Sequence, residues 1–224
     1  MKKNVLILGL LFIGSFAICQ NDKQTEYLFG NNGSVMINGF GAPFVEFSKH
    51  GDEFAVSSGG GGAVLINQTF FFGAYGMGLA TEHTLSGLKI KQSNGLVTNY
   101  PTMRKIFGHG GFWLGYIHNR KEAIHWGLST KIGWGSVGLC DADLENCDKG
   151  QIGIDNVFVF SPQVEMEMNM TRWFKINIGA GYRFVSGIDK TYVNADGITQ
   201  KYYDSSDFNS PQLTIGLLFG GFGR

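Results

Sequence analysis

Net charge, proline and long hydrophobic runs are all scarce in this sequence. Lys and Arg together number 18, as do Asp and Glu, so the charge does not indicate a nucleic-acid partner. After Ala17 no run approaches the roughly 20 apolar residues that a membrane-spanning helix requires. Only four prolines accompany 34 glycines. That glycine content would destabilise a helical protein, whereas in a small barrel glycine relieves crowding and lets strands bend.

The first residues are typical of an export signal. Lys2 and Lys3 precede the apolar run from Val5 to Ala17, and Ala17-Ile18-Cys19 provides a small-residue cleavage site. We expect a signal peptide at 1–19, a periplasmic lead-in at 20–33 and a single domain at 34–224. The alternative is a lipoprotein with lipid on Cys19, although Ile18 is bulky for the position before it.

The stretch from Val157 to Phe184 predicts two β-strands joined by a tight turn. Apolar and polar side chains alternate along both arms, a period of two that only a strand separates onto opposite faces. The apolar face comprises Phe158, Phe160, Val164, Met166, Met168, Phe174, Ile176, Ile178, Ala180, Tyr182 and Phe184. A strand that crosses a bilayer has about 9–11 tilted residues, apolar outside and polar inside, with aromatic residues at the interfaces. We therefore expect a transmembrane β-barrel.

Similar alternation elsewhere brings the expected number of strands to eight. They cover about 34–48, 53–65, 70–79, 106–117, 124–134, 157–169, 174–184 and 212–220. The second, fourth and sixth connections are short, whereas the third, fifth and seventh, at 80–105, 135–153 and 186–211, are long. This asymmetry is typical of an all-β, antiparallel up-and-down barrel with short periplasmic turns and longer extracellular loops. Pro43 predicts a bulge in the first strand.

With this pattern, residues 34–224 resemble the small eight-stranded outer-membrane proteins of Gram-negative bacteria, such as OmpX and the membrane domain of OmpA. The last strand, with Leu213, Ile215, Leu217 and Phe219 on one face, is similar to the aromatic-ended signal read by the barrel-assembly machinery. Here the chain ends in Gly-Phe-Gly-Arg rather than in a terminal Phe. The resemblance implies a multi-pass β-barrel in contact with outer-membrane lipid and lipopolysaccharide. The glycine-rich composition is similar to that of a Bacteroidota-type subgroup of these barrels, and this similarity implies no particular activity.

Charged residues fall on the faces expected to point into the barrel. The acidic ones are Glu46, Glu165 and Glu167, and the basic ones are His125, Lys131, Lys175 and Arg183. Eight strands enclose an interior that side chains can fill, and an unpaired buried charge is costly. We therefore expect these groups to pair as a network that closes the lumen, with a narrow pore as the alternative.

An envelope enzyme that modifies lipids is a further alternative. Its candidate groups are His125, Ser129 and a lumen carboxylate, Glu165 or Glu167. Four residues along a strand separate His125 from Ser129 by about 13 Å, so these two side chains cannot form a nucleophile–base pair. We expect no enzyme activity and no cofactor.

The predicted loops contain two further groups of interest. Cys140 and Cys147 form an even pair in an exported chain, which favours a disulfide over two reduced thiols. The acidic residues around them, from Asp141 to Asp148, lack the glycine and the final glutamate of a calcium loop, so we expect no metal site. Basic residues at Lys89, Lys91, Arg104 and Lys105 are suited either to lipopolysaccharide phosphates or to ordinary solvation.

The preferred interpretation is an outer-membrane barrel with a structural or interaction role. Its long loops would contact something outside the cell, or its wall would bind a larger outer-membrane complex. A soluble, lipocalin-like barrel that binds an apolar ligand is the alternative, and it would turn Glu165, Glu167, Lys175 and Arg183 toward water. The long-loop, short-turn asymmetry and the aromatic bands argue against this alternative.

Overall fold

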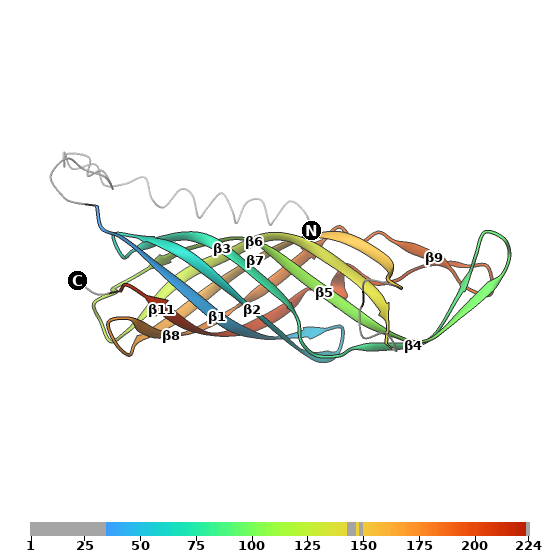
Figure 1. Ribbon diagram of the computed structural model, residues 1–224, viewed down its shortest axis with the longest axis horizontal. Coiled ribbons are helices and arrows are strands. Elements are labelled where there is room, and N and C mark those ends of the chain that lie inside the picture. The colour runs from blue at the N-terminus through green and yellow to red at the C-terminus, as the bar shows by residue number, and fades with distance from the viewer. Residues whose placement is uncertain (1–34, 143–146, 148–149, 223–224) are drawn as a thin grey trace, which may run out of the picture. The chain divides into compact units, whose positions relative to one another are not determined.

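The computed structural model describes residues 35–142, 147 and 150–222. Most of these residues form antiparallel strands (Figure 1). The strands are β1 (Ile37–His50), β2 (Glu53–Ile66), β3 (Phe70–Leu79), β4 (Thr84–Lys91), β5 (Val97–Ile117), β6 (Ile124–Asp141), β7 (Ile152–Asn169), β8 (Phe174–Ser186), β9 (Thr191–Val193), β10 (Thr199–Lys201) and β11 (Ser210–Gly220). The predicted signal peptide and the lead-in lie outside the described residues.

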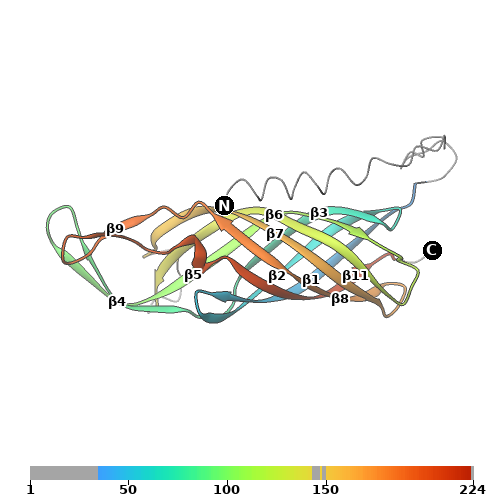
Figure 2. The same cartoon turned by 180° about the vertical axis from the view of Figure 1, so that it is seen from behind.

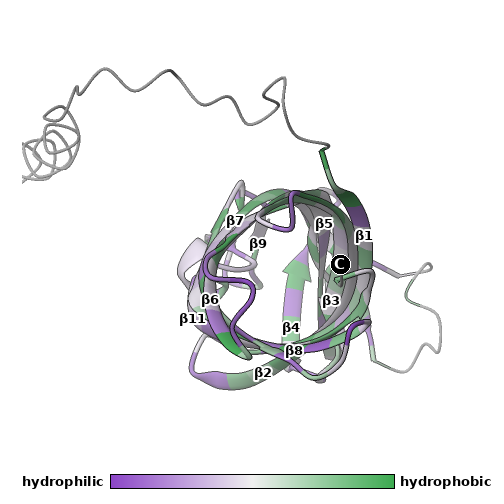
Figure 3. Ribbon diagram, turned by 90° about the vertical axis from the view of Figure 1, so that its left-hand side faces the viewer, coloured by the Kyte–Doolittle hydropathy of each residue, from purple (hydrophilic) through white to green (hydrophobic). Residues whose placement is uncertain are grey.

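Eight of these strands close into a barrel. Their order is β3-β2-β1-β11-β8-β7-β6-β5, and β3 pairs with β5 to complete the ring (Figure 3). The first and last barrel strands pair antiparallel, with Val45 opposite Ile215. The predicted all-β, eight-stranded antiparallel up-and-down barrel is confirmed. No helix among the described residues is long and apolar enough to span a membrane.

The two ends of the barrel differ in their connections. At the turn end, which is also where β1 begins and β11 ends, short turns link β2 to β3, β5 to β6 and β7 to β8. Asn67 and Asn119 adopt the left-handed conformation in two of these turns, with φ of 51° and 49°. Asparagine tolerates this conformation better than most residues, which allows the chain to reverse within a few residues. At the opposite end, called the loop end below, the tight β1–β2 turn is accompanied by three longer connections.

Two of the predicted long loops contain strands that the sequence pattern did not reveal. Within the predicted loop at 80–105, β4 pairs with the first part of β5 and forms an arm that extends beyond the barrel (Figure 1 and Figure 2). The predicted loop at 186–211 contains the β9–β10 hairpin and a single 3₁₀ turn, Ser205–Asp207. These strands are exposed on more than one side, so no apolar face marks their period in the sequence. In addition, β6 continues to Asp141 and β7 begins at Ile152, which shortens the predicted loop at 135–153.

The bulge predicted at Pro43 is absent from the β1–β2 pairing. That register is continuous, and Pro43 lies opposite Gly60. Pro43 points away from the lumen on an exposed position, and its glycine partner leaves space beside the proline ring. The register shift that does occur lies between Val137 and Leu139, on β6.

The outer face of the barrel carries large apolar side chains on all eight strands. Large side chains exposed there include Val45, Val64, Phe72, Phe112, Leu128, Trp134, Phe160, Val164, Phe184, Ile215 and Leu217. We call this surface the apolar band. The charged side chains Glu165, Glu167, Lys175 and Arg183 are buried inside instead. This distribution is the reverse of the one that the lipocalin-like alternative required, and that alternative is therefore wrong.

Candidate functional site

Two kinds of side chain point into the lumen from opposite walls. On the wall formed by β1, β2, β3 and β5, rings predominate, with Phe40, Phe44, Phe71, Tyr75 and Trp113 all buried. On the wall formed by β6, β7, β8 and β11 the inward positions are mainly polar or charged. The rings need space, and glycine provides it, since a side chain at Gly115 would clash with the Phe71 ring and one at Gly133 with the Tyr75 hydroxyl.

One ion pair joins the first strand to the polar wall near the loop end. Arg183 of β8 donates from Nη1 to Glu46 Oε1 of β1 at 2.7 Å. Both side chains are almost fully buried, at 0% and 1% exposed. Arg183 Nε also donates to the backbone carbonyl of Phe208 at 3.0 Å. The guanidinium therefore binds the barrel wall and the β8–β11 loop at once.

A second group of charges lies toward the turn end. Glu167 Oε2 accepts from Lys175 Nζ at 2.9 Å and lies 3.1 Å from His125 Nε2. Two residues earlier on the same face of β7, Glu165 accepts from Ser129 and also from Asn177, the latter at 3.0 Å. His125 thus contacts Glu167 and Ser129 contacts Glu165, in two separate groups. The triad considered for a lipid-modifying enzyme is not assembled.

Lys131 lies between the Glu46–Arg183 ion pair and the group around Glu165. It is 2% exposed, and its Nζ lies 4.6 Å from the centre of the Phe44 ring. The carboxylates that act on it electrostatically are those of Glu46 and Glu165. Among the described residues Lys131 forms no direct ion pair. All seven charged residues singled out in the sequence therefore point into the lumen, although Lys131 is not directly paired.

Three histidines near the loop end of the lumen were not singled out in the sequence. The His50 ring lies 5.6 Å from that of His83 and 5.1 Å from that of Phe208, and His109 lies 3.0 Å from the Tyr75 hydroxyl. His83 also contacts Glu53 at 2.6 Å. The sequence could have indicated an inward position for His50, because it lies four residues after Glu46 on the same strand and therefore on the same face of β1. The contact between His50 and the later loop residue Phe208 has no such signal.

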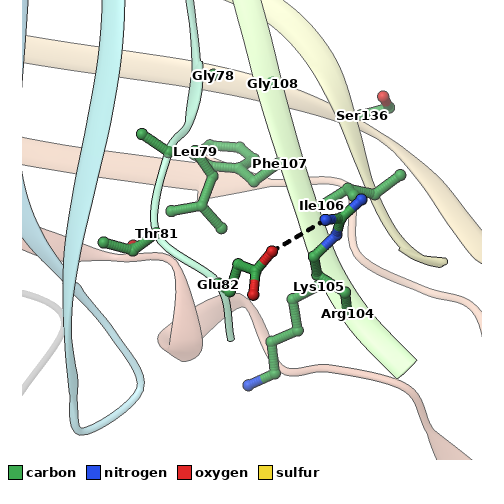
Figure 4. A pocket seen from close by; sticks show the side chains of 11 residues that line it. Gly78, Leu79, Thr81, Glu82, Arg104, Lys105, Ile106, Phe107, Gly108 and Ser136 are labelled. Carbon is green, nitrogen blue, oxygen red and sulfur yellow. Dashed lines mark hydrogen bonds and ion pairs between the residues drawn. The ribbon is translucent and has the colours of Figure 1, made fainter. Parts of the chain in front are cut away.

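A notch interrupts the barrel wall at the loop end. After Leu79 the chain stays with β2, since the backbone N–H groups of Ala80 and Thr81 both donate to Val56. The separation from β5 leaves a cavity of about 460 Å³ whose lining includes Leu79, Ile106 and Phe107. Figure 4 shows Arg104 joined to Glu82 beside this notch, a contact of 3.1 Å, while the Lys105 side chain extends away from the pair.

The four basic residues considered for either lipopolysaccharide phosphates or ordinary solvation do not form one cluster. Arg104 and Lys105 line the notch. Lys89 and Lys91 lie on β4, and Thr84 is the β4 residue that pairs with Arg104. Lys89 is five residues further along β4, which places it about 16 Å from the notch at 3.3 Å per residue. The chain thus offers two separate basic regions.

The β4–β5 arm and the β9–β10 hairpin, called the two arms below, meet at the loop end. A single bridge pairs Ile90 of β4 with Asn194, next to β9. The Tyr192 and Tyr202 rings lie 4.8 Å apart, and the next residue, Tyr203, is buried against Phe208. Burial, reinforced by the neighbouring Tyr202 and Asp155, raises the pKa of the Tyr203 hydroxyl above its usual value. This part of the β8–β11 loop is therefore packed onto the barrel rather than free in solvent.

Cys140 and Cys147 are joined by a disulfide at the end of β6. Arg104 Nη2 donates to Cys147 Sγ at 3.0 Å, which places the bridge next to the notch. Among the described residues no three potential ligands converge on a metal position. Asp143, Glu145 and Asp148 of the acidic loop lie outside the described residues.

We expect the Cys140→Ser/Cys147→Ser variant to be less stable than the wild type by about 2 kcal/mol, because a short cross-linked ring restricts the unfolded chain. Urea unfolding in lipid vesicles, followed by gel mobility, measures the difference. The loss should vanish when both proteins are unfolded in excess reductant. An equal loss with and without reductant would show that the serines, rather than the missing bridge, are responsible.

Comparisons with known proteins find similarity in structure alone. No protein-family model matches the chain, and no curated protein sequence matches it. Neisserial surface protein A aligns over 84% of this chain and 99% of its own, with 8% identity and a TM-score of 0.49. A major outer membrane protein of Thermus thermophilus aligns over 82% and 98%, with 11% identity and a TM-score of 0.46. Neither comparison bears on a Bacteroidota affiliation, and the assignment of the fold rests on the strand pairing itself.

Proposed function

We propose that the chain is an outer-membrane β-barrel with a structural or interaction role, a closed lumen and loop-end arms that serve as its contact surface. One observation carries this proposal: an apolar band surrounds a closed barrel whose interior contains buried charges. In hydrocarbon every backbone polar group must be paired within the protein, and a closed barrel meets this requirement. The same surface in water would expose large apolar side chains on every side of the barrel, whereas soluble monomers rarely expose large contiguous apolar patches.

Aromatic residues near the two ends of the apolar band support a membrane-spanning position. Trp126 and Trp173 are exposed near the turn end, and Trp134 and Tyr182 are exposed further toward the loop end. Rings of this kind favour the boundary between lipid and water. With the predicted export signal, the outer membrane is the membrane in which such a barrel is found. The short turns would then face the periplasm and the arms the outside, and the barrel-assembly machinery would insert the chain.

The filled lumen argues for a contact role rather than for transport. Phe44, Trp113 and the Glu46–Arg183 pair occupy the interior, and Phe208 packs near the loop end. Barrels of eight strands are filled by side chains rather than open. The arms, in contrast, expose Leu96, Val97 and Ile198 near their tips. Apolar side chains at the ends of projecting hairpins suit a contact with another molecule, such as a further outer-membrane protein complex.

Lipopolysaccharide is the proposed lipid partner. Arg104 and Lys105 line the notch in the wall at the loop end, where the outer leaflet would lie. Its apolar lining by Leu79, Ile106 and Phe107 suits an acyl chain. Arginine and lysine beside such a surface favour the phosphates of anionic head groups. Lys89 and Lys91 on the arm would reach polar parts further from the membrane.

Heat modifiability tests the proposal. We expect the protein in the outer-membrane fraction, with different gel mobility in unboiled and boiled samples, because a closed barrel resists unfolding in mild detergent. Planar bilayers containing the folded protein should show no steady conductance, since the lumen is filled. A soluble protein without a mobility shift would contradict the membrane assignment. A steady ion current would instead contradict the closed lumen and favour the narrow pore.

A further inference from the structure

A basic cup lies at the turn end of the barrel, opposite the arms. Its cavity volume is about 340 Å³. The lining comes from several parts of the ring, with Leu65 from β2, Arg120 from the β5–β6 turn, Arg172 from the β7–β8 turn, Lys175 from β8 and Phe222 from beyond β11. The cup therefore lies at the turn end of the lumen, where residues from several parts of the ring meet, rather than on the outer wall.

The charges around this cup are unbalanced. Three of its lining residues are cations, Arg120, Arg172 and Lys175, and none of its described lining residues is acidic. Lys175 is paired with Glu167. Neither Arg120 nor Arg172 forms an ion pair with any described residue. After the Lys175–Glu167 pair is set aside, two guanidinium groups remain beside one hollow, and no carboxylate of the described residues pairs with either of them.

Backbone and ring contacts hold the segments that carry these cations. Asn169 Nδ2 donates to the carbonyl of Arg120 at 3.1 Å and to that of Glu122 at 2.7 Å, which ties two neighbouring turns together. The backbone N–H of Phe222 donates to the carbonyl of Arg172 at 3.2 Å. Lys175 Nζ lies 4.6 Å from the centre of the Phe222 ring. The cup is thus built by tied segments, and its two arginines extend from positions that are already fixed.

We propose that the basic cup binds a phosphate group. Arginine presents several N–H donors in a planar fork that matches a phosphate, and a second arginine beside the same hollow adds further positive charge. The cavity is larger than a phosphate ion, and Leu65 and Phe222 give it an apolar side suited to a small organic group next to the phosphate. Trp173, next to Arg172, is exposed and places this turn near the height of lipid head groups.

Two sources can supply this chemistry, a soluble phosphate compound and the head group of a phospholipid in the adjacent leaflet. The proposal does not depend on the role given to the arms, because it concerns the opposite end of the barrel. It is tested on the folded full chain in a non-ionic detergent and in nanodiscs. Isothermal titration with pyrophosphate and with glycerol 3-phosphate measures the soluble source, and native mass spectrometry measures the retention of phosphatidylglycerol.

The variant to test is Arg120→Gln/Arg172→Gln, and Lys121→Gln is its matched control. Lys121 lies in the same turn as Arg120 and carries the same charge, but it does not line the cup. We expect each lost arginine to weaken phosphate binding by about tenfold, since hydrogen bonds between charged groups are the strong ones. The control should stay within about twofold of the wild type, because its side chain is solvated and does not line the cup. A mobility shift on boiling confirms that each variant is folded.

Loss of pyrophosphate or glycerol phosphate binding in the double variant supports a soluble ligand, and loss of retained phosphatidylglycerol supports a head group. The Arg120→Lys/Arg172→Lys variant keeps the charge without the planar fork and should bind with intermediate strength. The proposal is overturned if the wild type binds none of these probes, or if the double variant binds as well as the wild type. An equal loss in Lys121→Gln would likewise overturn it, since diffuse charge would then explain the binding.

Discussion

We expect the Arg183→Met variant to lose about 3–5 kcal/mol of the free energy of unfolding, because it leaves the buried Glu46 carboxylate without its cation. Methionine retains an unbranched apolar stem but not the guanidinium, so the loss reports chiefly the missing charge and its hydrogen bonds. The variant also removes the hydrogen bond from Arg183 to the Phe208 carbonyl. Urea titration of the barrel in lipid vesicles, with folded and unfolded forms separated by gel mobility, measures the change.

A second substitution separates the charge effect from the lost contacts. In Glu46→Gln/Arg183→Met the buried charge is gone, so most of the stability should return, as replacement of both members of a buried pair is often nearly neutral. Arg172→Met removes an exposed arginine and should change stability by no more than about 0.5 kcal/mol. If Arg183→Met were as stable as Arg172→Met, the Glu46–Arg183 pair would have no role in holding the barrel closed.

The second large effect concerns the outer face, where an arginine in the apolar band would lie in hydrocarbon. Ile215 lies in the middle of β11, opposite Ile178 of β8 and Val45 of β1. We expect Ile215→Arg to destabilise the barrel in lipid vesicles by about 2–4 kcal/mol, the cost of an arginine at the bilayer midplane. The same unfolding titration in vesicles measures this change.

A control substitution at the edge of the apolar band tests whether the cost of an arginine falls with its distance from the bilayer midplane. Ser186 is exposed at the loop end of β8, two residues beyond the outward-facing Phe184. Ser186→Arg should cost no more than about 1 kcal/mol, because arginine near the interface can reach water. Equal losses at Ile215 and Ser186 would contradict a depth-dependent environment and with it the membrane-spanning position of the band.

The barrel strands could be predicted from the sequence because each has one apolar and one polar face. The third strand was predicted with the observed bounds, and the second, fourth and last were found with shifted ends. The arms could not be predicted in the same way. Leu85 and Leu88 of β4 do not alternate with their neighbours as a half-buried strand requires, and Gly87 adopts a positive φ of 72° within it. Pairing with β5, rather than burial of one face, defines that strand.

For the lumen, the alternation of side chains along each strand identified which charged residues point inward, but it did not identify which of them contact each other. Glu165 and Glu167 share one face of β7, yet their partners come from both neighbouring strands. The partner of Glu46 lies 137 residues further along the chain. Such pairings depend on how strands are staggered around the ring, and that stagger is not visible in the period of any single strand. The basic cup had even less signal, because its cations come from two turns and a strand.

The placement of Glu46 has a consequence for the order in which the barrel assembles. The contacts of Glu165 and Glu167 all lie within the consecutive strands β6, β7 and β8, so hairpins of that region can form them before the ring is complete. Glu46 belongs to the first strand and meets Arg183 only after β11 has joined β1 to β8. An open sheet inserted in lipid would therefore carry an unneutralised acid and an unneutralised base, each at considerable cost. Partly closed forms should be disfavoured, which makes the final zipping of β1 to β11 a cooperative, all-or-none step.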